Sequence, residues 1–243
     1  MVDRRRHRGQ DPEDAKLFAA SQVSKLQKAA GDYCLLLTKG YPPVGSLKLV
    51  GDHFSLRARQ RLAVMRTGCS DGQIVQRKEK QISVAELSGR GVAIDGYNLL
   101  ITIETALSGG FLFKCADGCF RDLAGLHGTY RQVEETVGAI ELTAEVLAGF
   151  GVEDVLWLFD RPVSNSGKLK TLIYEMAERN GWQWNAELHF NPDKELAEID
   201  RIVVSSDSDV LDKCKSWVNL TEAIIAKLVD RDIQLRIIDL AGS

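Results

Sequence analysis

The sequence lacks a long apolar segment. Of its 243 residues, 44% are hydrophobic and 27% are charged, yet no apolar run approaches the roughly 20 residues that a helix needs to cross a bilayer. The first eight residues are basic and no apolar segment follows them, so we expect neither a secretion signal nor membrane insertion. The sequence therefore predicts a cytoplasmic protein whose core is large enough for one domain or two.

Cysteine is also scarce. Five scattered cysteines are too few for a disulfide scaffold, and their odd number favours reduced thiols. Cys115 and Cys119 precede His127, but a structural zinc site takes four ligands at a tighter spacing. We therefore expect no zinc site.

The net charge of −3 hides an uneven distribution. Residues 1–90 carry 17 Lys and Arg against 9 Asp and Glu, whereas residues 91–243 carry 14 against 25. A basic part joined to an acidic part is typical of a polyanion-binding surface beside a carboxylate-rich site. Two unrelated solvated surfaces would give the same split.

The basic part is predicted to be helical. Apolar residues recur at helical spacing from Pro12 to about Thr67, with breaks at the Gly40 to Pro43 turn and again near Gly51. Ser55 is a plausible N-cap for a final basic helix. Two helices joined by a tight turn resemble a helix-turn-helix, although small helical bundles contain such corners too. We assign residues 1–70 to a small all-α domain and 71–90 to a connector or small hairpin.

From residue 91 the pattern changes to alternating strands and helices. Short apolar runs predict strands at 92–94, 155–159, 202–204 and 235–238, with a strand pair within 111–120 and another strand at 182–188. Helical stretches separate them. This alternation predicts an α/β domain over 91–243, with a mainly parallel sheet covered by helices on both faces.

Three of these strands end in aspartate. Asp95 follows the first, Asp160 the second, and Asp207 and Asp209 follow the third. Single aspartates are common in turns and caps, but at neighbouring strand ends they could converge on a hard divalent cation. We expect Mg²⁺ or Mn²⁺ to be held by these four.

Two further polar clusters are candidates for substrate binding. The loop after Asp160 contains Ser164, Ser166 and Lys168, which could hold a phosphate at a helix N-terminus, or cap that helix. Arg121 lies in a polar cluster that runs from Asp117 to His127, where it is expected to contact substrate or to pair with a neighbouring aspartate.

The motifs resemble those of PIN-like and NYN-type ribonuclease domains, and the fuller pattern is similar to a largely archaeal two-domain family of unknown function. The matching stretches are Gly40 to Pro42, Leu49 to Asp52, Ile94 to Leu100, Asp117 to Asp122, Asp160 to Gly167 and Ser205 to Asp209. The resemblance implies a PIN-like three-layer domain in which Asp95 is the primary metal ligand and Asn98 orients it or contacts substrate. Carried over in the same way, Asp160, Asp207 and Asp209 complete the acidic pocket, and Asp193 and Asp200 are additional candidates. The resemblance also implies an acidic residue on a middle helix, for which Glu134, Glu135 and Glu141 are candidates.

These observations predict a metal-dependent ribonuclease that hydrolyses RNA phosphodiester bonds. An incomplete acidic set would instead leave a non-catalytic nucleic-acid-binding or regulatory module. A phosphatase of the haloacid dehalogenase type is a third reading, but Tyr97 stands where that family has its second aspartate. The expected partner is RNA, and a homodimer is left open.

Overall fold

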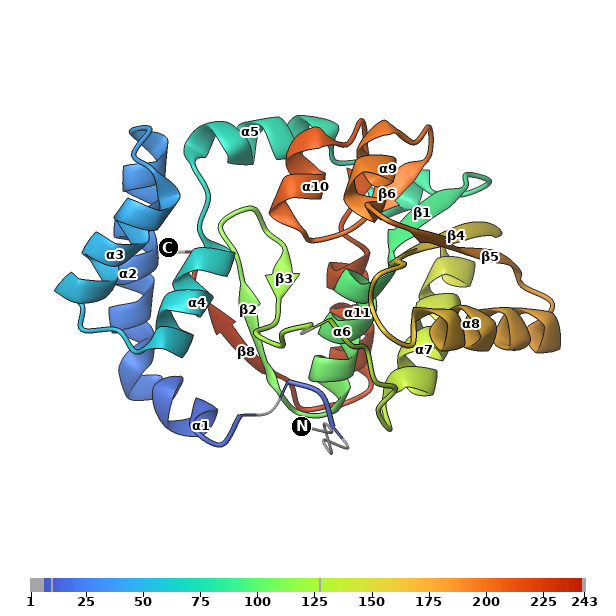
Figure 1. Cartoon of the computed structure of the whole chain (residues 1–243), viewed down its shortest axis with the longest axis horizontal. Helices are drawn as coiled ribbons and strands as arrows, with labels where there is room; N and C mark the ends of the chain where they lie inside the picture. Colours follow the sequence, from blue (N-terminus) through green and yellow to red (C-terminus); the bar gives the residue numbers. More distant parts are fainter. Residues whose placement is uncertain (1–6, 10, 127, 242–243) are drawn as a thin grey trace.

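The computed structural model describes residues 7–9, 11–126 and 128–241 (Figure 1). The chain begins with five helices and continues as alternating strands and helices. The helices are α1 (Asp14–Leu17), α2 (Ala20–Thr38), α3 (Pro43–His53), α4 (Ala58–Thr67), α5 (Asp71–Lys80), α6 (Gly96–Leu107), α7 (Thr136–Gly149), α8 (Ser166–Asn180), α9 (Pro192–Glu198), α10 (Ser208–Lys213) and α11 (Leu220–Asp230), with a 3-10 turn η1 (Val84–Glu86). The strands are β1 (Val92–Asp95), β2 (Phe111–Lys114), β3 (Phe120–Arg121), β4 (Asp154–Asp160), β5 (Gln183–His189), β6 (Ile202–Val204), β7 (Trp217–Val218) and β8 (Arg236–Asp239).

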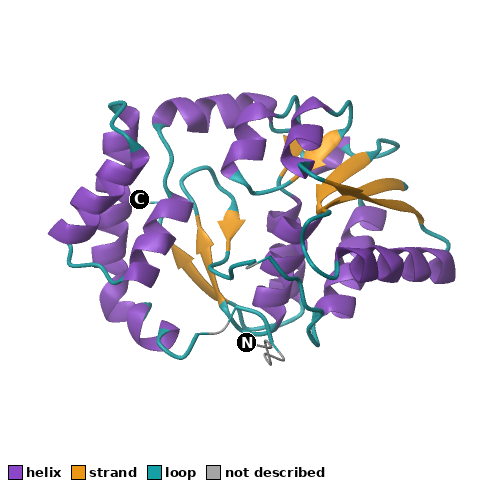
Figure 2. Ribbon diagram, in the orientation of Figure 1, coloured by secondary structure: helices purple, strands orange, loops and turns teal. Residues whose placement is uncertain are grey.

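Five strands form one parallel sheet in the order β5-β4-β1-β6-β7. Side chains of β1 alternate between its two faces, as the strand pleat requires. Ile94 packs in the cluster that includes α6, α7, α8 and α11, while Ala93 packs with α9 and α10 on the other face. The expected α/β architecture with a parallel sheet covered on both sides is therefore confirmed (Figure 2).

The last predicted strand belongs to a different sheet. We expected residues 235–238 to continue the parallel alternation, but β8 pairs with β2 in a three-stranded sheet ordered β3-β2-β8. The fifth position of the main sheet is taken by β7, whose two residues were too few to give a periodic signal. Fully buried Phe113 of β2 meets Phe18 of the N-terminal region edge to face, with ring centroids 4.9 Å apart.

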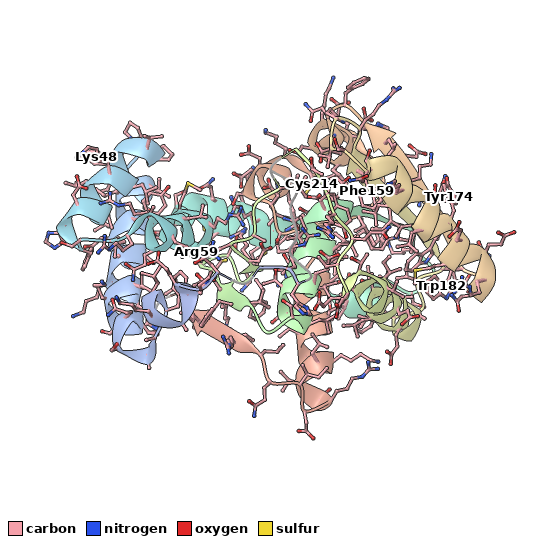
Figure 3. The ribbon with its side chains drawn as sticks, turned by 60° about the horizontal axis from the view of Figure 1, so that its bottom comes forward. Lys48, Arg59, Phe159, Tyr174, Trp182 and Cys214 are labelled. Carbon is pink, nitrogen blue, oxygen red and sulfur yellow. The ribbon has the colours of Figure 1, made fainter. Side chains whose placement is uncertain are left out.

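The N-terminal helices share a core with this small sheet. One apolar cluster joins α2, α3 and α4 to Phe113, Leu123, Ile238 and Leu240. Figure 3 shows side chains filling the space between the two parts, with Arg59 at the boundary. Its guanidinium pairs with Asp14 and also reaches the carbonyl of Leu123. The helical region is thus confirmed, but it is packed on β2 and β8.

Residues 71–80 form helix α5, where a connector or hairpin was expected. The helix has no apolar period, and polar contacts hold it in place instead. Arg77 pairs with Asp117 and Asp212, and the Trp217 indole donates to the Arg77 carbonyl at 2.7 Å. Its N-cap is Ser70, whose hydroxyl accepts from the Gln73 N–H. The expected N-cap of α4 was also wrong, because Ser55 lies in the preceding turn with φ of 50° and Arg57 is the N-cap.

Within the described residues no helix is both long and apolar enough to span a membrane.

Candidate active site

The site lies at the carboxyl ends of three adjacent strands. β1 is central in the sheet and is flanked by β4 and β6, and all three run parallel. Asp95 and Asp160 end the first two strands, and Asp207 comes three residues after β6. Because parallel strands end at the same edge, the sequence placed these side chains correctly on one edge of the sheet.

Asp95 is the most buried of these carboxylates. It is 9% exposed, and its Oδ2 accepts a hydrogen bond of 2.8 Å from the Ser205 hydroxyl. Burial raises the pKa of Asp95 to about 7, and the charges of Asp207 and Asp193 add to the rise, whereas Ser205 opposes it. The next residue, Gly96, packs directly against the Phe159 ring, and a Cβ at this position would clash with that ring.

Two other aspartates belong to the same electrostatic cluster. Burial raises the pKa of Asp160. Asp193, in the first turn of α9, also has a raised pKa, because of burial and the charges of Asp207, Asp160 and Asp209. Asp193 is therefore near the predicted set. Asp200 is not, since it pairs with Lys215 beside Arg90, Gly91 and other residues at the start of the strands.

Asp207 and Asp209 have different environments. The Asp207 side chain is the N-cap of α10 and accepts from the N–H groups of Asp209 and Val210. Asp209 is exposed. In the part of the chain that the structure describes, no three Asp, Glu, His or Cys side chains are grouped closely enough to hold one metal ion.

The loop between β6 and α10 is fixed from both sides. Asn98 Oδ1 accepts from the backbone N–H and the hydroxyl of Ser206, at 2.8 and 2.9 Å. Arg121 is 7% exposed, and its Nε donates to the Ser206 carbonyl at 2.6 Å. Both residues, expected to contact substrate, therefore position the loop that carries Asp207.

Arg121 also takes part in a buried ion network. Its guanidinium pairs with Asp117 at 2.6 Å, and the same carboxylate pairs with Arg77 at 2.5 Å. The pairing with Asp117 is one of the two that the sequence left open. His127, at the end of the same cluster, lies outside the described residues.

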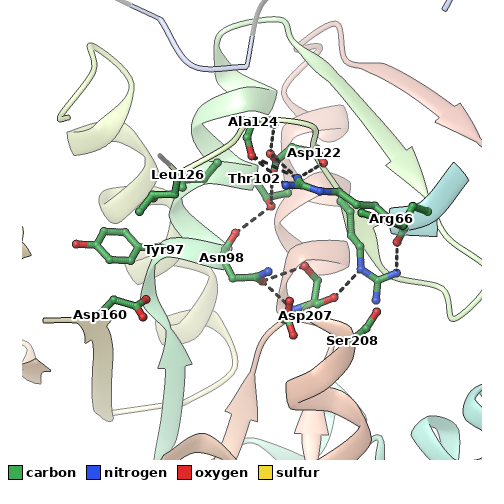
Figure 4. Close-up of a pocket in the computed structure, with 14 residues that line it drawn as sticks. Arg66, Tyr97, Asn98, Thr102, Asp122, Ala124, Leu126, Asp160, Asp207 and Ser208 are labelled. Carbon is green, nitrogen blue, oxygen red and sulfur yellow. Dashed lines mark hydrogen bonds and ion pairs between the residues drawn. The ribbon is translucent and has the colours of Figure 1, made fainter. Parts of the chain in front are cut away.

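A pocket of about 440 Å³ opens beside Asp160 and Asp207 (Figure 4). It lies between the sheet edge and helix α4. Its walls are formed by Met65, Arg66, Tyr97, Asn98, Ile101, Thr102, Arg121, Asp122, Ala124, Leu126, Asp160, Ser206, Asp207 and Ser208. The pocket thus combines carboxylates, the guanidinium groups of Arg66 and Arg121, and several apolar side chains.

The Tyr97 ring lines the pocket beside Asp160 (Figure 4). It packs between Tyr130 and Phe159, and the residue is 6% exposed. Its hydroxyl has no close hydrogen-bond partner among the described residues. Burial and the charge of Asp160 raise the pKa of Tyr97, and the nearby Ser166 hydroxyl partly offsets the rise. The phenol therefore remains protonated and able to donate.

Sequence reasoning missed the wall opposite the aspartates. Arg66 donates to the carbonyls of Asp122 and Ala124, and Thr102 donates to the Asp122 carboxylate at 2.8 Å (Figure 4). Burial raises the pKa of Asp122, and the positive charge of Arg66 partly offsets that rise. Arg66 was visible only as one cation of a basic helix, and no local pattern linked it to the strand ends.

The remaining predicted residues lie around the site without lining the pocket. Ser164 is exposed and its backbone pairs with residues 128 and 130, Ser166 is buried at the start of α8, and Lys168 is exposed on that helix. Neither serine is the N-cap, which is Asn165. Of the middle-helix candidates, Glu134 and Glu141 are exposed and Glu135 pairs with His7; none lines the pocket.

Three arginines of the basic helix α4 form ion pairs within the molecule. Arg59 pairs with Asp14, Arg61 with Asp52, and Arg66 with Asp122 at 3.6 Å. The pairs of Arg59 and Arg61 lie within the N-terminal region, and the pair of Arg66 joins that region to the α/β part.

The comparisons with known proteins match both parts of the chain. A family model described as a domain of unknown function, DUF5616, matches residues 84–223, and one described as a protein of unknown function, DUF434, matches residues 25–80. The uncharacterized protein MJ0935 of Methanocaldococcus jannaschii is 31% identical over 186 residues, which covers 76% of this chain and 88% of that protein. No solved structure matches the chain. The expected two-part family with an archaeal relative is confirmed.

Proposed function

The chain belongs to the family of the domain of unknown function DUF5616, and from the geometry of its own site we propose that it is a divalent-cation-dependent ribonuclease. The observation that carries the proposal is the cluster of aspartates at the carboxyl ends of the central strands. Burial is the main cause of the raised pKa of Asp95, and Asp207 and Asp193 lie close enough for their charges to add to it. A folded chain gains nothing from such repulsion unless a cation relieves it or function requires it.

The donor chemistry fits Mg²⁺ or Mn²⁺. All the groups concerned are oxygen donors, which hard cations prefer. Mg²⁺ in proteins is commonly held by one or two carboxylates and keeps several waters, so a site of this kind needs no group of three ligands. Asp95 and Asp160 would hold the ion, with Asp193 and Asp207 reaching it directly or through its waters.

A bound cation would supply activation of water and would neutralise charge on phosphate oxygens. The chain's own groups do the rest. Asn98 and Arg121 hold the loop that presents Asp207. The Tyr97 ring forms a wall of the pocket beside Asp160, with its hydroxyl buried, and Arg66, paired with Asp122, lies on the opposite wall.

A PIN-like fold is part of this proposal. Its support is the parallel order β5-β4-β1-β6-β7, with the first strand central and ending in Asp95. Helices on both faces and acids at the ends of the central strands are compatible with it.

Cleavage of RNA by purified protein with Mn²⁺ or Mg²⁺ tests the proposal. Asp95→Asn is expected to lower the rate at least 100-fold, and a chelator should abolish cleavage. Asp200→Asn is the matched control, because that aspartate is exposed and sits at the opposite edge of the sheet. Cleavage that persists at the same rate in Asp95→Asn rejects the assignment.

A non-catalytic nucleic-acid-binding module is the second candidate. It is favoured by the role of Asp207 as a helix cap and by the lack of a three-carboxylate group within the described ranges. Binding of RNA without cleavage, unchanged by chelator, would select it.

A further inference from the structure

Phe190 is an exposed aromatic ring next to the candidate active site. It follows β5 directly, and 73% of its surface is open to solvent. A large apolar side chain so exposed contributes little to the core, and its exposure carries a cost in water. The ring is therefore accessible to a binding partner.

A guanidinium is already stacked on this ring. The Arg161 guanidinium carbon lies 4.9 Å from the Phe190 ring centroid, within the range of a cation–π contact. The Arg161 backbone N–H donates to the His189 carbonyl at 2.8 Å. The backbone segments that carry the two side chains are therefore tied together at the ends of β4 and β5.

The pair stands on the same edge as the aspartates. In the β4–β5 register Asp160 is opposite His189, so Arg161 and Phe190 are each one residue beyond that pair. Adjacent strands are about 4.8 Å apart. Phe190 therefore lies about one strand spacing from the Asp160 strand and about two from the Asp95 strand. Neither Arg161 nor Phe190 lines the pocket, but an extended strand that ran along this edge of the sheet from Asp160 would reach the ring next.

The charge of Arg161 is free for a ligand. Among the described residues it makes no ion pair with a carboxylate, whereas neighbouring His189 is engaged by Glu187 at 2.9 Å and Glu195 at 3.7 Å. An aromatic ring beside an uncompensated cation matches a nucleotide, which offers a flat base and an anionic phosphate.

We propose that Phe190 and Arg161 bind one unpaired nucleotide of an RNA strand, next to the nucleotide that lies at Asp160. The base stacks on Phe190 and the phosphate contacts Arg161. This assignment rests on the proposed ribonuclease function and names its substrate class as single-stranded RNA, because a base within a duplex cannot present its face to the ring.

Binding of a short fluorescein-labelled single-stranded RNA, measured by anisotropy in a chelator so that no cleavage occurs, tests the assignment. Phe190→Ala and Phe190→Leu should both weaken binding by roughly 5- to 100-fold, the range for loss of one stacked base. Phe190→Trp should keep the affinity, and its added indole emission should be quenched by RNA. Arg161→Ala should weaken binding and reduce its dependence on salt.

Val44→Ala is the control, since Val44 is 83% exposed on α3 and should not affect binding. The comparison of Phe190→Leu with wild type decides the result, because leucine keeps apolar surface and loses only the ring. If wild type binds and cleaves RNA while Phe190→Leu binds equally well, the stacking assignment is overturned and the ribonuclease stands. If wild type neither binds nor cleaves RNA, both proposals fall.

Discussion

At the scale of single residues, Asp95 is where burial and charge act most strongly. The carboxylate is buried at the end of the central strand, accepts one hydrogen bond from Ser205 and faces two further acids. Its protonation should therefore influence both stability and cation binding. A conventional surface aspartate would influence neither.

The stability of the cation-free protein should fall as pH rises through this group. The pKa of Asp95 is about 7 in the folded state and about 3.9 in an unfolded chain. Between these values the folded state keeps a proton that the unfolded chain releases, so the free energy of unfolding declines from about pH 4 to pH 7. Asp95→Asn carries no charge at any pH and should lack this decline.

Urea denaturation in a chelator at pH 5 and pH 8 measures the effect. Relative to wild type, Asp95→Asn should gain on the order of 3 kcal/mol between the two conditions, from about 1.4 kcal/mol per pKa unit. Asp200→Asn should run parallel to wild type. A difference between Asp95→Asn and wild type that is the same at both pH values would contradict the burial argument.

At the scale of elements, α5 shows a helix held by charge rather than by an apolar face. Arg77 is 1% exposed and connects the helix to Asp117 and to Asp212 of α10. Arg121 shares Asp117 and reaches the Ser206 carbonyl. The helix is thereby coupled to the loop that carries Asp207.

Arg77→Met should destabilise the protein by about 3–5 kcal/mol, because removing one partner leaves buried carboxylates without full compensation. The loss should be largest in α5 itself, so amide hydrogen exchange of residues 71–80 should accelerate more than that of the central strand β1. Lys78→Met, an exposed change on the same helix, should alter neither quantity by a comparable amount. Equal effects of the two variants would show that the network does not hold α5.

At the scale of the whole molecule, the N-terminal helices and the α/β part are joined through the small sheet. β2 and β8 supply Phe113 and Ile238 to the core of α2, α3 and α4. All four tryptophans lie between residues 157 and 217, outside that core. Tryptophan fluorescence therefore reports on the α/β part alone, whereas helical circular dichroism reports on the helices of both parts.

We expect both signals to change in one coincident unfolding transition. Ile238→Ala should lower the free energy of unfolding by about 2–5 kcal/mol, as for other buried Ile to Ala changes, and should shift both signals equally. Ile237→Ala is the matched control, because that side chain is 38% exposed on the same strand. A shift of the circular dichroism transition alone would indicate two independently folding units.

The sequence by itself determined the α/β class, most helices and strands, and the alignment of Asp95, Asp160 and Asp207 on one edge of a parallel sheet. These features follow from local periodicity and from the rule that parallel strands end together. The tertiary structure alone decided that β8 leaves the main sheet and that α5 docks through ion pairs. It also decided that Arg66 and Asp122 close the pocket and that Arg161 stacks on Phe190. Those contacts join residues far apart in the chain through packing and charge, which no local pattern encodes.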